Sequence, residues 1–174
     1  MKKILIIGIK SFIAQNITNF LKDYFILSKV SYSQFNKISK KQLINFDYLI
    51  NCSVSKKYVQ NKYMTSNDLD LQIAKKISRL SIKMIFLSSR KVYKCGDNLK
   101  ENSKIYPQCN YSRNKIITEK KLKDILFDKV LILRISNLIG KPNLNLSKRK
   151  IHYTFIDSFF LNIKNNKIFD NKYL

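Results

Sequence analysis

Five short apolar runs, separated by stretches with helical patterns, set the strongest limit on how this chain can fold. The runs are rich in β-branched residues and nearly continuous in hydrophobicity, which is typical of strands covered on both faces of a parallel sheet. They are Ile4–Ile7, Tyr24–Leu27, Tyr48–Asn51, Met84–Leu87 and Val130–Ile135. This alternation of strands and helices predicts a doubly wound, three-layer α/β/α domain with a parallel sheet.

The segments between the runs carry apolar residues at helical spacing. We expect helices over Phe12–Leu21, Lys40–Ile44, Asp68–Leu80, Asn110–Leu126 and Tyr153–Ile163. In the third, an apolar stripe begins at Leu69, and Ser66 or Asn67 is expected to cap the helix. In the fourth, apolar residues such as Leu122 should face the sheet.

The length and the net charge of the chain exclude few functions. The chain has 174 residues, 45% of them hydrophobic, which is enough for one domain with a buried core. Its net charge of +23 alone would suggest binding to nucleic acid or to an anionic membrane. The lysines, however, are spread along the whole chain, and only 3 glycines and 2 prolines accompany them. This pattern favours solvated lysines, and a basic nucleic-acid-binding module stays as the alternative of a different class.

Cysteine and histidine usage argues against a metal site. Cys52, Cys95 and Cys109 are odd in number and lack metal-ligand spacing, and His152 is the chain's one histidine. A zinc site would therefore lack partners. Reduced thiols suit a cytosolic protein, and no signal peptide or bilayer-crossing segment is evident. We expect a cytoplasmic protein with no metal and no membrane partner.

The first apolar run ends in a glycine turn. Gly8 would let the backbone turn sharply, and the following helix would aim its N-terminal amides at a phosphate group. Ser11 stands where a second glycine would be usual, and Ala14 preserves close packing between helix and strand. A dinucleotide-binding turn and a plain strand–turn–helix connection both fit this pattern.

A tyrosine and a lysine are spaced one helical turn apart in the fourth expected helix. Tyr111 and Lys115 should face the same way, and Ser88 and Ser89 close an apolar run upstream. A phenol beside a fixed ammonium can transfer protons, because the positive charge favours tyrosinate. The spacing alone proves little, since Tyr58 and Lys62 repeat it.

Several short motifs follow one another between Met1 and about Gly140. The most specific is the run Ser88-Ser89-Arg90-Lys91-Val92-Tyr93, followed by Tyr111-x-x-x-Lys115 and Glu119. The other pieces are the Gly8 to Ala14 turn, Asn51-Cys52-Ser53, Asn67, Glu101, Pro107 and Leu133 to Gly140. Together they resemble the extended short-chain dehydrogenase/reductase family, which contains sugar-nucleotide epimerases, dehydratases and reductases. The resemblance implies a Rossmann-like domain and selects Tyr111 over Tyr58.

The resemblance also implies roles for individual residues. Tyr111 would be the acid/base, Lys115 would lower its pKa and hold the nicotinamide ribose, and Ser89 would hydrogen-bond the substrate oxygen. Without the resemblance, the two serines would simply end a strand. The implied cofactor-binding residues are Gly8, Ser11, Phe12, Ile13, Cys52, Ser53, Asn67, Ser88 and Lys115.

The resemblance implies NAD or NADP as cofactor and a nucleotide sugar as substrate. The segment after the second strand, from Lys29 to Ser33, lacks the carboxylate that many NAD-binding relatives use. Ser31 or Ser33, with Lys29 or Lys37 nearby, would tolerate a 2′-phosphate, so either dinucleotide fits. Relatives commonly pair through the helix that carries the tyrosine, and a homodimer is one expectation.

The domain organisation follows from the same resemblance. We expect an NAD(P)-binding domain over residues 1–150 and the start of a truncated substrate-binding portion over residues 151–174. The expected function is an NAD(P)-dependent epimerase, dehydratase or reductase. A non-catalytic dinucleotide-binding remnant of the same family is the alternative.

Overall fold

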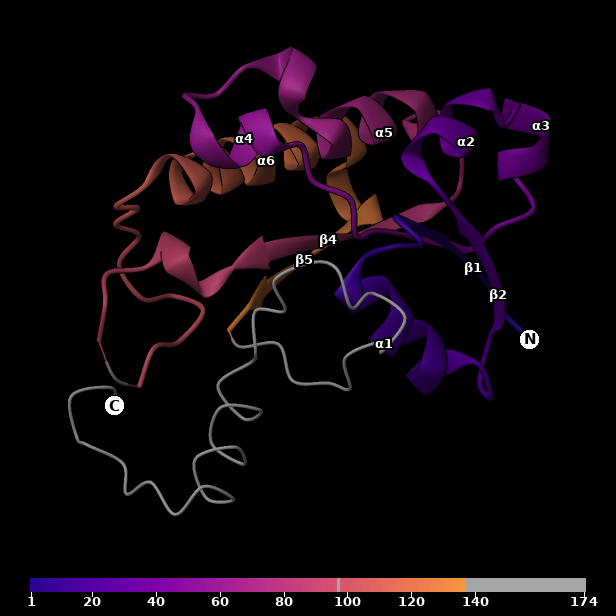
Figure 1. Ribbon diagram of the computed structural model, residues 1–174, viewed down its shortest axis with the longest axis horizontal. Helices are drawn as coiled ribbons and strands as arrows, with labels where there is room; N and C mark the ends of the chain where they lie inside the picture. The colour runs from indigo at the N-terminus through magenta and orange to yellow at the C-terminus, as the bar shows by residue number, and fades with distance from the viewer. Residues whose placement is uncertain (97, 137–174) are drawn as a thin grey trace. The chain divides into compact units, whose positions relative to one another are not determined.

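A computed structural model describes residues 1–96 and 98–136, which form a parallel five-stranded sheet (Figure 1). The strand order is β2-β1-β3-β4-β5, with every neighbouring pair parallel. The strands are β1 (Lys3–Ile7), β2 (Ile26–Val30), β3 (Tyr48–Asn51), β4 (Lys83–Ser89) and β5 (Val130–Ile135). This confirms the predicted Rossmann-like sheet, and it brings the carboxyl ends of the strands to one edge.

Helices cover both faces of this sheet. In Figure 1, α1 lies on one face, and α2 to α6 lie on the other. The α-helices are α1 (Phe12–Leu21), α2 (Tyr32–Lys37), α3 (Lys40–Leu43), α4 (Lys56–Gln60), α5 (Leu69–Ile77) and α6 (Asn110–Leu126). Single 3₁₀ turns are η1 (Thr65–Asn67), η2 (Arg90–Val92) and η3 (Phe127–Lys129). Within the described residues, no helix combines the length and apolar character needed to cross a bilayer.

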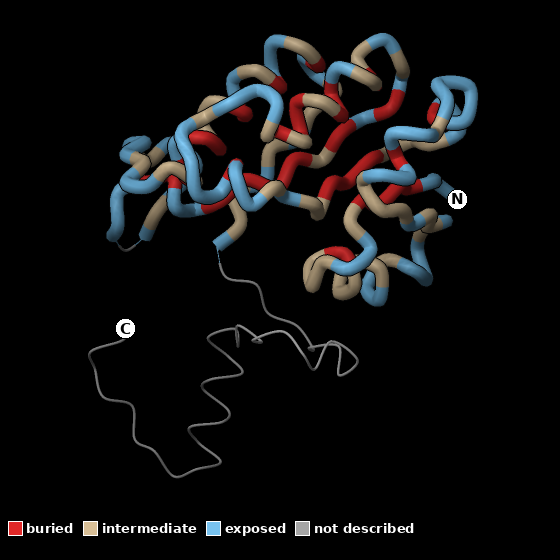
Figure 2. The backbone as a smooth tube through the Cα atoms, turned by 45° about the horizontal axis from the view of Figure 1, so that its top comes forward, coloured by how far each residue is buried: buried red, intermediate tan, exposed pale blue. Residues whose placement is uncertain are grey.

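The core is divided by the sheet into two apolar clusters. Along β1, Ile4 and Ile6 pack with Ala14 of α1, whereas Leu5 and Ile7 belong to the cluster beneath α5 and α6. Alternate side chains of a strand point to opposite faces, so a strand buried on both faces must be apolar throughout. Figure 2 shows the buried strands in red at the centre of the domain.

The predicted elements and the observed ones differ mainly at their ends. The second strand begins at Ile26, because its register pairs Ile26 with Lys3, and Tyr24 is left exposed before it. The cap of α5 is Asp68, whose carboxylate accepts a hydrogen bond from the Leu71 amide. The prediction that Ser66 or Asn67 caps this helix is therefore wrong.

Two short helices were not predicted. They are α2, which a Ser31–Gln34 capping box begins, and α4, which carries the buried Tyr58. Both are too short for a repeating apolar stripe to show in the sequence. The predicted helix Tyr153–Ile163 and the predicted domain boundary at residue 150 lie outside the described residues.

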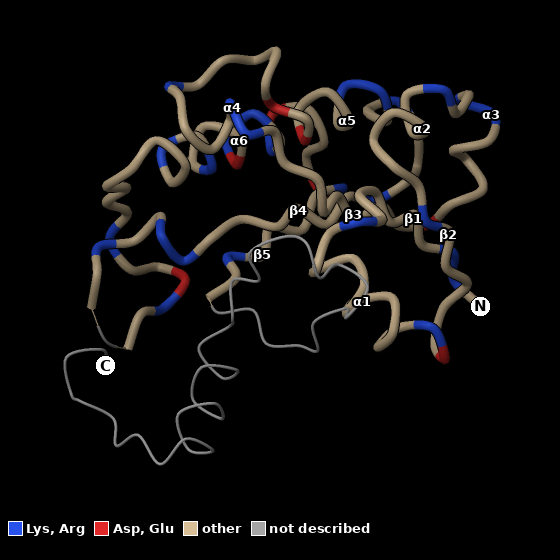
Figure 3. Tube along the Cα trace, in the orientation of Figure 1, with Lys and Arg blue, Asp and Glu red and all other residues tan. Residues whose placement is uncertain are grey.

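Lysine and arginine residues are distributed over helices, strands and loops rather than gathered on one element (Figure 3). This agrees with the predicted spread of lysines along the sequence. Four charged residues are instead buried, namely Asp68, Asp70, Lys115 and Glu119. All four lie on α5, on its cap or on α6, so the fully buried charges of the described residues belong to two packed helices. Their contacts define the candidate site.

Candidate active site

Gly8 makes the turn from β1 towards α1, as predicted. Its φ of +99° lies in the region that favours glycine, and a Cβ there would come within 2.6 Å of Ser53 Oγ. It would also lie 3.0 Å from the carbonyl carbon of Cys52. The turn after β1 and the turn after β3 are therefore packed against each other, and only glycine fits between them.

Ser11 is the N-cap of α1, and its hydroxyl makes no capping hydrogen bond to the helix. Its backbone amide donates to the Gly8 carbonyl at 2.8 Å. Ala14 is buried against β1, which confirms its predicted packing role. The first amides of α1, those of Phe12 and Ile13, thus begin a ten-residue helix at the carboxyl end of β1. Such an end can hold an anionic group.

Asn51 connects the end of β3 to α5. Its Oδ1 accepts from the Ser53 amide at 3.0 Å, and its Nδ2 donates to the Ser53 carbonyl at 3.1 Å. The same Nδ2 donates to Asp70 Oδ1 at 2.8 Å. Cys52 lies between Asn51 and Ser53 in the sequence. Burial raises the pKa of its thiol to about 12, so Cys52 is a protonated packing residue at neutral pH.

Lys115 lies in a pocket of rings and one carboxylate. Its side chain is 6% exposed, and its Nζ is 3.8 Å from Asp70 Oδ2. The Nζ is also 4.4 Å from the centre of the Phe86 ring and 5.7 Å from that of Tyr111. These distances suit cation–π contacts. Tyr111 and Lys115, paired by sequence spacing, are therefore together in the structure.

The pKa of Tyr111 is raised by its surroundings in the structure. Burial raises the pKa of this phenol, and the charges of Asp70 and Cys109 raise it further. The family resemblance implies that Lys115 lowers this pKa, and that contribution stays a prediction. Because the ammonium of Lys115 is paired with Asp70, the carboxylate offsets the charge that would favour tyrosinate.

The two serines at the end of β4 have different partners. The Ser88 hydroxyl is buried and donates to Glu119 Oε1 at 2.5 Å. The Ser89 hydroxyl accepts from the Lys91 amide at 3.3 Å, at the start of η2. Ser88 thus has a structural partner on α6, while Ser89 ends the strand at the edge where ligands of parallel sheets bind. The predicted roles of both towards a ligand stay predictions.

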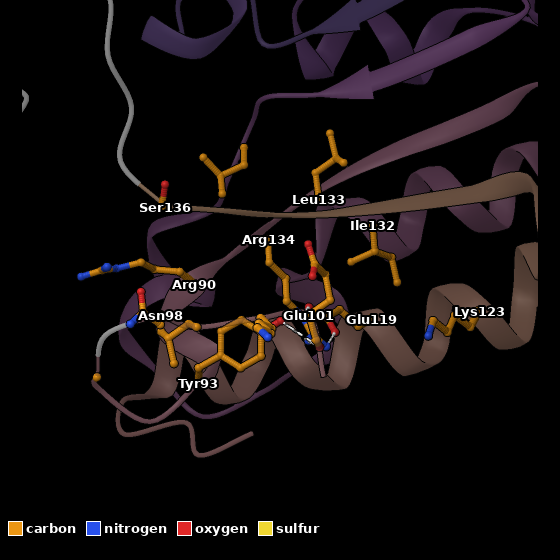
Figure 4. A pocket seen from close by; sticks show the side chains of 14 residues that line it. Arg90, Tyr93, Asn98, Glu101, Glu119, Lys123, Ile132, Leu133, Arg134 and Ser136 are labelled. Carbon is orange, nitrogen blue, oxygen red and sulfur yellow. Dashed lines mark hydrogen bonds and ion pairs between the residues drawn. The ribbon is translucent and has the colours of Figure 1, made fainter. Parts of the chain in front are cut away.

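Glu119 forms the centre of a polar network between α6 and β5. Arg134 donates to Glu119 from Nε at 3.0 Å and from Nη2 at 2.6 Å, and its Nη1 donates to the Tyr93 hydroxyl at 2.7 Å. A cavity of about 730 Å³ opens beside this network (Figure 4). Arg90 and Ser136 also line it, whereas Ser89, Tyr111 and Lys115 do not. This cavity is therefore separate from the residues to which the proton-transfer chemistry is predicted.

Sequence reasoning missed Asp70, the carboxylate nearest Lys115. The signal was present, because Asp70 shares an i, i+3, i+4, i+7 stripe with Ile73, Ala74 and Ile77, all of them buried. A carboxylate on the apolar face of a helix marks a buried charge that needs a partner. Asn67 lies in η1, where its amide donates to the Met64 carbonyl, so it precedes the helix rather than opening it.

Comparison with known proteins identifies a matching family and several solved structures of similar fold. The sequence model described as the NAD dependent epimerase/dehydratase family matches residues 4–172. No curated protein sequence matches the chain significantly.

Solved structures of similar fold include sugar-nucleotide enzymes. A dTDP-4-dehydrorhamnose reductase from Yersinia enterocolitica has a TM-score of 0.64 and 21% identity, over 95% of this chain and 61% of its own. A UDP-N-acetylglucosamine 4-epimerase from Methanobrevibacter ruminantium M1 has a TM-score of 0.67 and 20% identity, over 95% and 64%. A reductase of the first type from Bacillus anthracis, in complex with NADP, has a TM-score of 0.65 and 17% identity, over 95% and 61%. The chain thus spans about three fifths of the length of these structures, and the likeness shows a shared fold.

Proposed function

The chain belongs to the NAD-dependent epimerase/dehydratase family, and on that premise we propose that it binds NAD or NADP and transfers a proton on the sugar of a nucleotide sugar. Ser89, Tyr111 and Lys115 are the proposed catalytic residues. The reaction is an epimerisation, a dehydration or a ketone reduction, since one proton-transfer site serves all three. Structures of similar fold support this class, because they include reductases and epimerases of sugar nucleotides.

The observation that carries the proposal is the placement of Lys115. Its ammonium is buried, lies over the Tyr111 ring and sits on the helix that packs against β4. Burying an ammonium is costly unless its charge is used or paired. A single carboxylate at 3.8 Å leaves hydrogen-bond donors of the ammonium for another oxygen. A ribose hydroxyl is such an oxygen.

The residues at the carboxyl edge fit a dinucleotide. Gly8 makes the tight turn after β1, and α1 follows it with Ser11 as the N-cap and Phe12 and Ile13 as its first residues. These groups would hold the pyrophosphate. Further candidates for contact with the dinucleotide are Cys52, Ser53, Asn67 and Ser88. When bound, the cofactor supplies the hydride chemistry, and the protein supplies orientation and proton transfer.

The proton transfer is assigned to Tyr111. An ordinary phenol is a weak base at neutral pH, and burial raises the pKa of Tyr111 further, so its resting form is the protonated acid. The phenol would donate its proton to a sugar carbonyl oxygen. In the opposite direction, the Lys115 charge would stabilise the tyrosinate, which would accept a proton from a sugar hydroxyl. Ser89 would hold that same oxygen by a hydrogen bond.

The test combines binding and turnover. NADH and NADPH are titrated against the protein by nicotinamide fluorescence, and turnover is measured with a panel of nucleotide sugars. Tyr111→Phe should retain dinucleotide binding and lose turnover by about 10²- to 10⁴-fold, the usual contribution of general acid–base catalysis. Tyr106→Phe removes an exposed phenol just before α6 and serves as the matched control. Undiminished turnover in Tyr111→Phe would refute the assignment.

Dinucleotide binding without turnover of any nucleotide sugar would support the non-catalytic alternative. Absence of dinucleotide binding, with a polyanion affinity that falls steeply as salt is added, would support the nucleic-acid alternative instead.

A further inference from the structure

A buried carboxylate faces the proposed catalytic lysine from a neighbouring helix. We propose that Asp70 is a positioning residue that fixes the Lys115 ammonium and offsets the charge that this ammonium exerts on the Tyr111 phenol. This inference rests on the proposed function of the site and adds a residue to it. Asp70 is 5% exposed and lies in the first turn of α5.

The orientation of the Asp70 carboxylate is fixed by β3. Its Oδ1 accepts from Asn51 Nδ2 at 2.8 Å, and Asn51 is itself held by the amide and the carbonyl of Ser53. The other oxygen, Oδ2, faces Lys115 Nζ at 3.8 Å. One oxygen is thus tied to the strand and the second is presented to the lysine. A carboxylate held in this way can hold a lysine in place.

No other carboxylate in the described part of the chain lies within ion-pair distance of Lys115. The neighbouring Asp68 is already occupied by hydrogen bonds. Its oxygens accept from the Leu71 amide at 3.0 Å, from the Tyr63 hydroxyl at 2.9 Å and from the Thr118 hydroxyl at 2.6 Å. Asp68 therefore stabilises the helix end and the α4–α6 side, while Asp70 is left to balance the lysine.

Other titratable groups surround the pair and contribute to its electrostatics. The groups that interact electrostatically with Asp70 or with Tyr111 are Asp68, Tyr32, Cys52, Tyr58 and Cys109. Burial raises the pKa of Cys52 and Tyr58. Because these two stay neutral near pH 7, the fixed charges at the centre of the site are those of Asp70 and Lys115, with Asp68 behind them.

The sign of the effect on Tyr111 follows from Coulomb's law. A carboxylate near a phenol disfavours tyrosinate and raises the pKa of the phenol, and a nearby ammonium does the opposite. Asp70 is among the causes that raise the pKa of Tyr111. Removing its charge while keeping its shape, as in Asp70→Asn, should therefore lower the pKa of Tyr111.

The experiment measures ionisation of Tyr111 rather than turnover. Near-ultraviolet phenolate absorbance is titrated in the unchanged protein and in Asp70→Asn, each against the same protein carrying Tyr111→Phe, so that the difference isolates one tyrosine among 10. We expect Asp70→Asn to lower the pKa of Tyr111 by about one unit or more. Asp70→Glu, which restores the charge, should return the pKa towards its original value. Asp124→Asn removes an exposed charge from α6 and should leave the pKa unchanged.

Titration of Tyr111 at the same pH in Asp70→Asn and in the unchanged protein would overturn the proposal, as would an equal shift in Asp124→Asn. If Asp70→Asn fails to fold, carbon-13 resonances of the Asp70 carboxyl and the Tyr111 ring are followed in the unchanged protein. Burial raises the pKa of Asp70 to about 6. We expect both resonances to move together near that pH. A Tyr111 ring that does not respond when Asp70 titrates would refute the coupling.

Neither titration requires a substrate. Failure of the proposed function would appear as lost dinucleotide binding or turnover with the Asp70–Tyr111 coupling intact. Failure of the inference would appear as absent coupling in a protein that still binds dinucleotide.

Discussion

Two buried ion pairs on α6 lie one helical turn apart and are built in opposite ways. Glu119 meets Arg134 through two hydrogen bonds of 2.6 and 3.0 Å, and it also accepts from Ser88. Lys115 meets Asp70 through one contact of 3.8 Å. The first pair is closed by direct hydrogen bonds, and the second is joined by a single longer contact. On the proposed function, the tight pair stabilises the fold, and the loose pair leaves the Lys115 ammonium available for a ligand.

The energetics of burial support this distinction. Desolvating two charges costs several kcal/mol, and only good geometry with further hydrogen bonds recovers that cost. The Glu119–Arg134 pair meets this condition and joins α6 to β5, and Ser88 ties it to β4. The Lys115–Asp70 pair does not meet it. A charge that is buried without full compensation is commonly found at functional sites.

The largest expected effect is a loss of turnover when the lysine of the Lys115–Asp70 pair is replaced. Lys115→Met should reduce turnover by about 10²- to 10⁴-fold, because Tyr111 loses the cation that assists its proton transfer. Lys120→Met, which removes an exposed lysine of the same helix, should leave turnover unchanged. Steady-state kinetics on both variants measure the contrast. Equal losses in the two variants would remove the distinction on which the assignment depends.

The next effect concerns stability. Glu119→Ala should lower the free energy of unfolding by about 3 to 5 kcal/mol, since Arg134 loses its partner and the Ser88 hydroxyl loses its acceptor. Glu101→Ala, which removes an exposed carboxylate beside the same network, should change it by no more than about 0.5 kcal/mol. Urea unfolding of both proteins provides the comparison. A Glu119→Ala protein as stable as the Glu101→Ala protein would show that the tight pair does not stabilise the fold.

The Lys115–Asp70 pair should instead make the free energy of unfolding depend on pH. The pKa of Asp70 is raised by burial from 3.8 to about 6, so the native state holds a proton that the unfolded state releases between these values. Its contribution to stability is complete below about pH 4 and is lost as the pH rises through 6, a change of about 3 kcal/mol. The stability of the unchanged protein relative to Asp70→Asn should fall over this range. A constant difference would contradict the raised pKa.

The smallest effect belongs to an exposed pair. Lys2 and Asp47 are joined at 2.9 Å on the surface, where solvent screens the charges and the side chains lose entropy on pairing. Lys2→Ala should therefore leave the urea midpoint unchanged within error. A shift as large as that of Glu119→Ala would show that burial is not what separates these pairs.

Much of the fold could be predicted because the strands are buried on both faces. Tyr48–Asn51, Val130–Ile135, Phe12–Leu21 and Asn110–Leu126 have the predicted bounds. The errors fall on short elements and on caps. There, a few side-chain hydrogen bonds such as that of Asp68 decide the outcome, and no long periodic pattern exists.

The candidate site was predicted in part. Spacing on one helix places Tyr111 beside Lys115, and the Gly8 turn follows from the glycine itself. The Asp70 contact could not be predicted with the same ease, because it joins residues 45 positions apart on separate helices. Electrostatic effects of this kind depend on tertiary packing, and burial together with the charge of Asp70 raises the pKa of Tyr111.

Fluorescence titration of NADH and NADPH against the unchanged protein, Lys115→Met and Lys120→Met tests the central claim most directly. If Lys115 is the buried cation of a dinucleotide site, the unchanged protein and Lys120→Met should bind one of the dinucleotides with similar affinity, and Lys115→Met should bind it at least about tenfold more weakly. Equal affinity in all three proteins would contradict the account, as would no binding in any of them.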